Sequence, residues 1–175
     1  AGQVTINTSG NATSGAITLS NIGNTFGTLV LTGGSLSVRE AAATDFTLLS
    51  ATGSLTVVSS GAVTDTGTVS VGTTTSVTAT GNDIALDSAA NSFDGALTLT
   101  GANVTIRDDS TTVLTAVTAT GAFTLTTADD VSQTGSIIVG GLATITTGTT
   151  IGHDIDLDMA ASTINFGSRA VTAAN

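Results

Sequence analysis

The only histidine of the chain, His153, begins a short acidic segment that could bind a metal ion. It is followed by aspartates at alternate positions: Asp154, Asp156 and Asp158. Carboxylate oxygens are the ligands that Ca²⁺ prefers. Along a strand, however, side chains two residues apart are separated by about 6.8 Å, which is too far for all three carboxylates to share one ion. The alternative interpretation is an acidic strand face in contact with solvent.

Two pairs of adjacent aspartates in expected turns are further calcium candidates. They are Asp108–Asp109 and Asp129–Asp130. Neither pair matches the EF-hand loop or the glycine-rich calcium nonapeptide. Aspartate is also favoured in turns for its own backbone hydrogen bonds, which explains both pairs without a metal. We therefore predict no cofactor, and Ca²⁺ at these acidic residues is the alternative that stays open.

Two of the arginines, Arg39 and Arg107, hold equivalent positions in an internal repeat described below. Each is followed by an acidic residue, Glu40 or Asp108. One interpretation is a repeated contact to a glycan or another anion. The other is an exposed ion pair between neighbouring coils, which would contribute at most about 1 kcal/mol.

Catalysis is not expected, and we predict no catalytic residue. Cleavage of a polysaccharide needs a base with cationic groups, or paired carboxylates, and such sites are usually lined by aromatic rings. The chain has one His, no Trp, no Tyr and no Lys. The residue types that carry this chemistry are therefore missing.

The charge of the chain restricts its partners. The net charge is −10, with 13 acidic residues against three arginines. Nucleic-acid binding needs clustered Lys or Arg, and anionic membranes attract basic segments, so neither partner is expected. The chain has no apolar run long enough to cross a membrane and no cysteine, so membrane insertion, disulfides and thiolate metal sites are not expected either.

Short alternating runs recur along the chain and predict strands with one buried face. Each run has apolar residues at i and i+2, and Gly, Asn, Asp or Ser separates it from the next. No convincing helical period is present. The runs are 29–31, 36–38, 55–57, 69–71, 84–86, 97–99, 104–106, 123–125 and 155–157.

The runs belong to a longer internal repeat. Residues 27–72 align without a gap onto residues 95–140, an offset of 68, with identity at 17 of 46 positions by our count. Residues 83–87 match residues 154–158 after a three-residue insertion. We predict one domain over residues 1–175, made of a partial unit 1–26, units 27–94 and 95–166, and a partial unit 167–175.

This pattern predicts an all-β, right-handed parallel β-helix with about three short strands in each coil. We expect each 68-residue unit to form three coils of about 23 residues, and the chain to form seven to eight coils in a rod of about 35 Å. Proline would interrupt the backbone ladder, and the chain has none. The alternative, an antiparallel sandwich, needs tight hairpins, but the only Asp-Gly dipeptide is Asp94-Gly95.

The segment from Asn82 to Gly101, NDIALDSAANSFDGALTLTG, resembles the repeat region of filamentous-haemagglutinin-like adhesins, and ATGAFTLT (residues 119–126) is similar to the same repeat. The family comprises large bacterial exoproteins exported by two-partner or autotransporter systems. The resemblance covers nearly the whole chain and implies an extracellular rod. It also implies roles in attachment, aggregation or biofilm.

We therefore expect a structural or adhesive rod segment of a secreted bacterial surface adhesin or extracellular filament. Two alternatives stay open: a β-helical filament subunit that stacks end to end, and a module that binds a glycan or host receptor through Arg39 and Arg107. Neither end of the sequence resembles a cap. The expected partners are thus neighbouring repeats or identical subunits, with surface glycans or a host receptor as further candidates.

Overall fold

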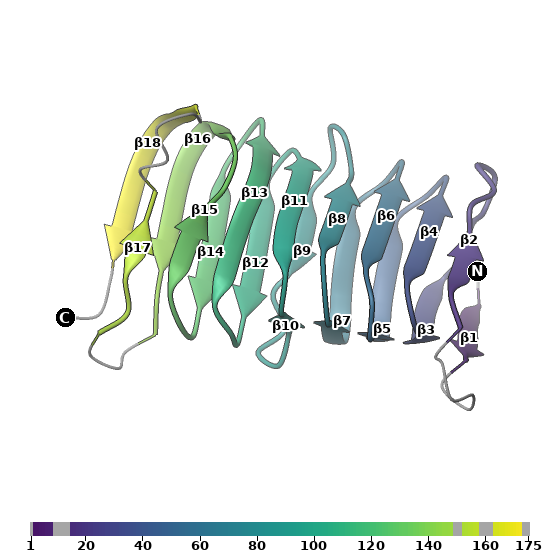
Figure 1. Cartoon of the computed structure of the whole chain (residues 1–175). Helices are drawn as coiled ribbons and strands as arrows, with labels where there is room; N and C mark the ends of the chain where they lie inside the picture. Colours follow the sequence, from purple (N-terminus) through teal and green to yellow (C-terminus); the bar gives the residue numbers. More distant parts are fainter. Residues whose placement is uncertain (1, 9–14, 149–151, 158–162, 173–175) are drawn as a thin grey trace.

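A computed structural model describes residues 2–8, 15–148, 152–157 and 163–172, with only the backbone of Arg169 and Val171. The described residues form a parallel β-helix, a rod in which about 7 coils stack along one axis (Figure 1). The predicted fold is confirmed, while its right-handed sense stays a prediction. The described residues contain no helix, and hence none that could span a membrane.

The strands follow one another closely along the chain. They are β1 (Gln3–Asn7), β2 (Ile17–Leu19), β3 (Thr28–Gly33), β4 (Leu36–Glu40), β5 (Thr44–Ala51), β6 (Leu55–Ser59), β7 (Val63–Val71), β8 (Thr75–Thr78), β9 (Ile84–Leu86), β10 (Ser92–Phe93), β11 (Ala96–Gly101), β12 (Val104–Asp108), β13 (Thr112–Ala119), β14 (Phe123–Thr127), β15 (Val131–Gln133), β16 (Ile137–Thr146), β17 (Ile155–Asp156) and β18 (Ile164–Thr172).

Alternation of side chains creates a continuous core. In β3 and β11, for example, every second residue is buried and the residues between them are partly exposed. The inward residues are mostly Val, Leu and Ile, with Phe46, Phe93 and Phe123 fully buried among them. One buried cluster extends from Ile17 to Ile145, so the two sequence repeats share one core.

The strands stack into three faces, which we name A, B and C. A strand that bends at a corner contributes one half to each of two faces. Face A contains β1, β3, the second halves of β5 and β7, β10, the first half of β13, β15 and β17. Face B contains β2, β4, β6, β8, β11, the second half of β13, and the first halves of β16 and β18. Face C contains the first halves of β5 and β7, β9, β12, β14, and the second halves of β16 and β18.

The coils are shorter than predicted. On face B, Leu36 pairs with Leu55, Leu55 with Thr75, and Thr75 with Leu97. One coil therefore takes about 20 residues, at the short end of the range for solenoid repeats. The predicted coil length is wrong because it assumed that the sequence repeat closes after a whole number of coils.

The 68-residue repeat is in fact one strand longer than three coils. Val104 is the repeat equivalent of Leu36, but it lies on face C, in β12, whereas Leu36 lies on face B. Within residues 28–95, β5 and β7 each cover two faces and the other strands cover one, which makes ten strand segments for three faces. Successive repeats are therefore rotated by one face about the rod axis.

Two glycines mark corners at which adjacent coils approach closely. Gly67 lies opposite the bulge in β5, and a Cβ at this position would overlap the carbonyl oxygen of Thr47. Gly135 is its repeat equivalent, and a Cβ there would overlap the carbonyl oxygen of Thr115. These carbonyls belong to the backbone, so no side-chain rotation can relieve the overlap. Both corners therefore require glycine.

We expect Gly67→Ala and Gly135→Ala each to lower the free energy of unfolding by about 2–3 kcal/mol, because the coils must separate to admit the methyl group. Urea unfolding followed by circular dichroism measures the change. Gly23→Ala is the matched control, since its Cβ would meet only Asn21 Oδ1 at 3.4 Å, and we expect a change within about 0.5 kcal/mol. Equal midpoints for the Gly67 and Gly23 variants would contradict the close approach.

Candidate functional site

His153 contacts two aspartates of the preceding coil. Because β17 pairs with β15, His153, which precedes β17, lies beside Asp129 and Asp130, which precede β15. His153 Nδ1 is 2.9 Å from Asp129 Oδ1 and 3.6 Å from Asp130 Oδ1. The sequence provided no partner for His153, because the contact depends on the register of two strands from successive coils, which are distant in the sequence.

This trio could hold a cation, but it also forms a complete bridge between coils without one. Its possible ligand atoms lie within 4.8 Å of one another. One imidazole nitrogen with two carboxylate oxygens suits a borderline cation such as Zn²⁺ better than Ca²⁺, which takes roughly six to eight oxygen ligands. Asp129 Oδ1 also accepts from Asp130 N at 2.9 Å, and Asp130 Oδ1 from Asp154 N at 2.9 Å. Asp130 Oδ1 and His153 thus link the segment before β15 to the segment before β17 without a metal ion.

The predicted row of aspartates after His153 is partly described. Asp154 and Asp156 are exposed, whereas Ile155 between them is partly buried, as the alternation predicts. Asp158 lies outside the described residues. In the part of the chain that the structure describes, the aspartates at 154 and 156 do not belong to a group of three converging metal ligands.

The two arginines in equivalent repeat positions lie on different faces. Arg39 is in β4 on face B, and Arg107 is in β12 on face C. Both side chains are exposed. Among the described residues, neither arginine forms an ion pair. One ligand therefore cannot contact both arginines on a single face, although the sequence repeat suggests an aligned pair.

The acids that follow these arginines are buried at the ends of their strands. Glu40 is 2% exposed and Asp108 is 1% exposed, so the predicted exposed ion pairs are wrong. Glu40 Oε1 accepts a hydrogen bond from Phe26 N at 2.6 Å, and Asp108 Oδ1 accepts one from Phe93 N at 3.1 Å. Each carboxylate therefore binds a backbone amide in the preceding coil. Asp108 therefore does not form an exposed pair with Asp109, which the predicted calcium site at these two residues requires.

The hydrogen bonds at Asp108 explain why a carboxylate is tolerated there. Its Oδ1 also accepts from Ser110 N at 3.2 Å and from Ser110 Oγ at 2.9 Å, and its Oδ2 accepts from Thr112 Oγ1 at 2.8 Å. Burial nevertheless raises the pKa of Asp108 above its ordinary value, because desolvation outweighs these contacts. Burial likewise raises the pKa of Glu40, whose Oε2 is buried without a hydrogen-bond partner.

A second polar cluster fills the bend in β7. Asn91 Oδ1 accepts from Val69 N at 2.8 Å, and Asn91 Nδ2 donates to Asp65 Oδ2 at 2.7 Å. Asp65 Oδ1 accepts from Asp87 N at 3.0 Å, and Oδ2 from Ser88 N at 3.3 Å. Burial raises the pKa of Asp65 despite these bonds. The side chains thus replace backbone pairing that the bend interrupts, a role that sequence analysis missed because Asn and Asp are also ordinary turn residues.

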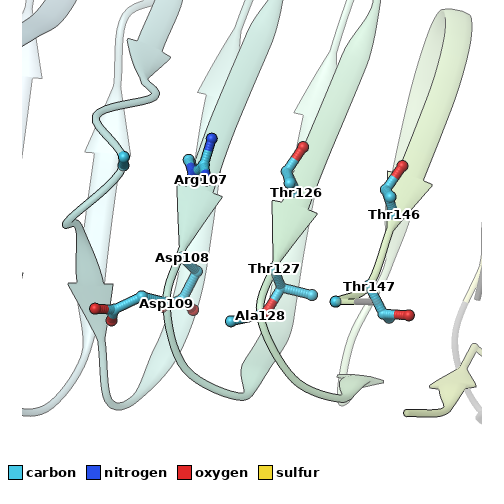
Figure 2. A pocket seen from close by; sticks show the side chains of 10 residues that line it. Arg107, Asp108, Asp109, Thr126, Thr127, Ala128, Thr146 and Thr147 are labelled. Carbon is cyan, nitrogen blue, oxygen red and sulfur yellow. The ribbon is translucent and has the colours of Figure 1, made fainter. Parts of the chain in front are cut away.

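A groove of about 330 Å³ lies along the strand ends of face C. Arg107 of β12 pairs in register with Thr126 of β14, which pairs with Thr146 of β16. Figure 2 shows these three side chains in one row across the strands, with the Asp109 side chain pointing away from them. The groove therefore presents one cation followed by two hydroxyl groups.

Comparison with known protein families identifies the repeat. A family model described as repeats of unknown function (DUF5649) matches residues 33–100 and again residues 101–174. The length of the first match equals the offset of the internal repeat, although the match starts at residue 33 and the predicted unit at residue 27. No curated protein and no solved structure matches the chain.

Two buried acids and one partly buried acid predict that the protein loses stability as the pH rises. The pKa values of Glu40, Asp65 and Asp108 are all raised in the folded state. Above the ordinary carboxyl values, the folded chain therefore binds more protons than the unfolded chain, and unfolding becomes easier as these groups ionise. We expect the thermal midpoint to be lower at pH 7 than at pH 4 in melts followed by circular dichroism.

Asp108→Asn should flatten this pH dependence, because the amide retains the Oδ1 acceptor for Phe93 N and carries no charge. Asp109→Asn is the matched control, since Asp109 is exposed and adjacent. It removes the same charge and should leave the slope unchanged. Identical slopes for the two variants would show that net charge, not burial, sets the pH dependence.

Proposed function

This chain belongs to the DUF5649 family of repeats, and from this premise we propose that it is a rod segment of a secreted surface adhesin or extracellular filament. Its function is to supply length and stiffness, so that adhesive regions stand away from the cell. It is not a catalyst. The protein participates in attachment, aggregation or biofilm through the structure that its repeats build together.

The observation that carries this proposal is the boundary between the two family repeats. The boundary at residues 100 and 101 lies inside β11. β11 pairs with β8 of the first repeat on one side and with β13 of the second repeat on the other. The ladder and the core therefore pass through the boundary without interruption. Repeats joined in this way form one stiff body, in contrast to domains connected by flexible linkers.

Composition supports an extended extracellular role. The net charge of −10 opposes lateral aggregation of a strand-rich surface, and the absence of cysteine means that stability does not depend on a redox environment. The resemblance to filamentous-haemagglutinin-like adhesins also supports secretion and a role in adhesion. None of these features requires a bound cofactor.

The rod proposal predicts the effect of adding one repeat. Insertion of a second copy of residues 33–100 after residue 100 should lengthen the rod by about three and a third coils, or about 16 Å at roughly 4.8 Å per coil. Small-angle X-ray scattering measures the maximum dimension, and negative-stain electron microscopy measures the length of longer arrays. The cross-section should stay constant.

Insertion of the same number of Gly and Ser residues at this point is the control. Such a linker would separate two bodies and give a broad distribution of lengths. If the added repeat gave the same broad distribution as the linker, the rod proposal would be wrong.

A surface location is tested on cells of the organism that produces the protein. Antibody against this chain should label intact cells, and external protease should remove the label without lysis. A cytosolic protein of the same cells is the control for leakage. Labelling that appears only after permeabilisation would exclude the extracellular part of the proposal.

A further inference from the structure

The groove on face C combines an arginine that forms no ion pair among the described residues with an aligned row of hydroxyl groups. The exposed Asp109 also lines the groove, but its side chain points away from Arg107 (Figure 2). Arg107 is exposed and forms no ion pair within the described part of the chain. The neighbouring acid, Asp108, is turned into the protein, where backbone and side-chain donors occupy both of its oxygens. Burial of this acid therefore leaves the Arg107 guanidinium available to an external anion, and arginine stays charged at all relevant pH values.

The hydroxyl groups beside Arg107 are held at regular spacing by the strand ladder. Thr126 and Thr146 follow Arg107 in register across β14 and β16, so the row extends over two coil spacings, or about 10 Å. Both threonines are partly exposed. The rigid ladder positions these groups before any ligand arrives, which reduces the entropic cost of binding.

We propose that this groove binds an acidic saccharide. A sugar carboxylate would pair with the Arg107 guanidinium, whose planar donors match carboxylate geometry. Ring hydroxyl groups would exchange hydrogen bonds with Thr126 and Thr146. The volume of about 330 Å³ lies within the range of small-ligand sites and suits about two sugar rings. This binding activity goes beyond the rod function and does not depend on it.

Arg39 is an internal control that the repeat provides. It is the repeat equivalent of Arg107, but its neighbour in the next coil is Val58, where Arg107 has Thr126. Its own following acid, Glu40, is also buried, so neither arginine pairs with the acid that follows it. Binding that needs only a free arginine would use both positions, whereas binding in the groove uses Arg107 alone.

The test is titration of the full chain with digalacturonic acid, and with the neutral galactobiose of the same linkage, followed by isothermal calorimetry or ligand-observed NMR. We expect saturable millimolar binding of the acid alone. Arg107→Gln should weaken it about tenfold, Arg107→Lys by less, and Thr126→Val about threefold. Arg39→Gln should bind like the unaltered chain. Circular dichroism confirms that each variant is folded.

Several outcomes would overturn the saccharide site. They are equal binding of the neutral disaccharide, equal loss of affinity in the Arg39 and Arg107 variants, and absence of saturable binding of the acid. Each leaves the rod proposal intact, because rod length is measured without any ligand. If the acidic saccharide binds as expected but an added repeat does not lengthen the molecule, the rod proposal is wrong and the saccharide site stands.

Discussion

The parallel backbone ladder is the constraint on which every other feature of this molecule depends. Each strand must hydrogen-bond to a strand one coil before it and another one coil after it, at about 4.8 Å. Side chains then have two positions only, inside the core or outside on a face. Bends between faces interrupt the ladder, and the structure compensates at these points: with glycine where coils touch, and with Asp65 and Asn91 where backbone groups lose their partners.

The sequence repeat is not a whole number of coils long, and this difference determines the face on which equivalent residues of successive repeats lie. Three coils end one strand before the sequence repeat is complete. Equivalent residues of consecutive repeats consequently occupy neighbouring faces. Arg39 and Arg107 show the effect directly, since one lies on face B and the other on face C. Core positions tolerate the rotation because the residues that point inward on all three faces are mostly Val, Leu and Ile.

The sequence was sufficient to predict a parallel β-helix but not the number of residues in each coil. Alternating runs such as Leu97-Thr98-Leu99 predicted their strands correctly, because a period of two follows from the strand itself. The coil length failed because a strand segment was undercounted: the bend inside β5 falls at Thr47, where no Gly, Asn or Asp signals a turn. Burial of Glu40 and Asp108 was missed for a related reason: an acid beside an arginine suggests a surface pair, and only the register reveals the backbone amides that it binds.

Because successive repeats are rotated, identical exposed residues in successive repeats do not lie on the same face of the rod. If every repeat carried the same exposed residue, that residue would wind around the rod and return to a given face only after three repeats, since each repeat advances by one face in three. A flat partner would then meet one copy per three repeats, about 50 Å apart at roughly 16 Å per repeat. With the proposed saccharide site, residues that differ between repeats, as the surroundings of Arg39 and Arg107 do, would determine which face of the rod binds the ligand.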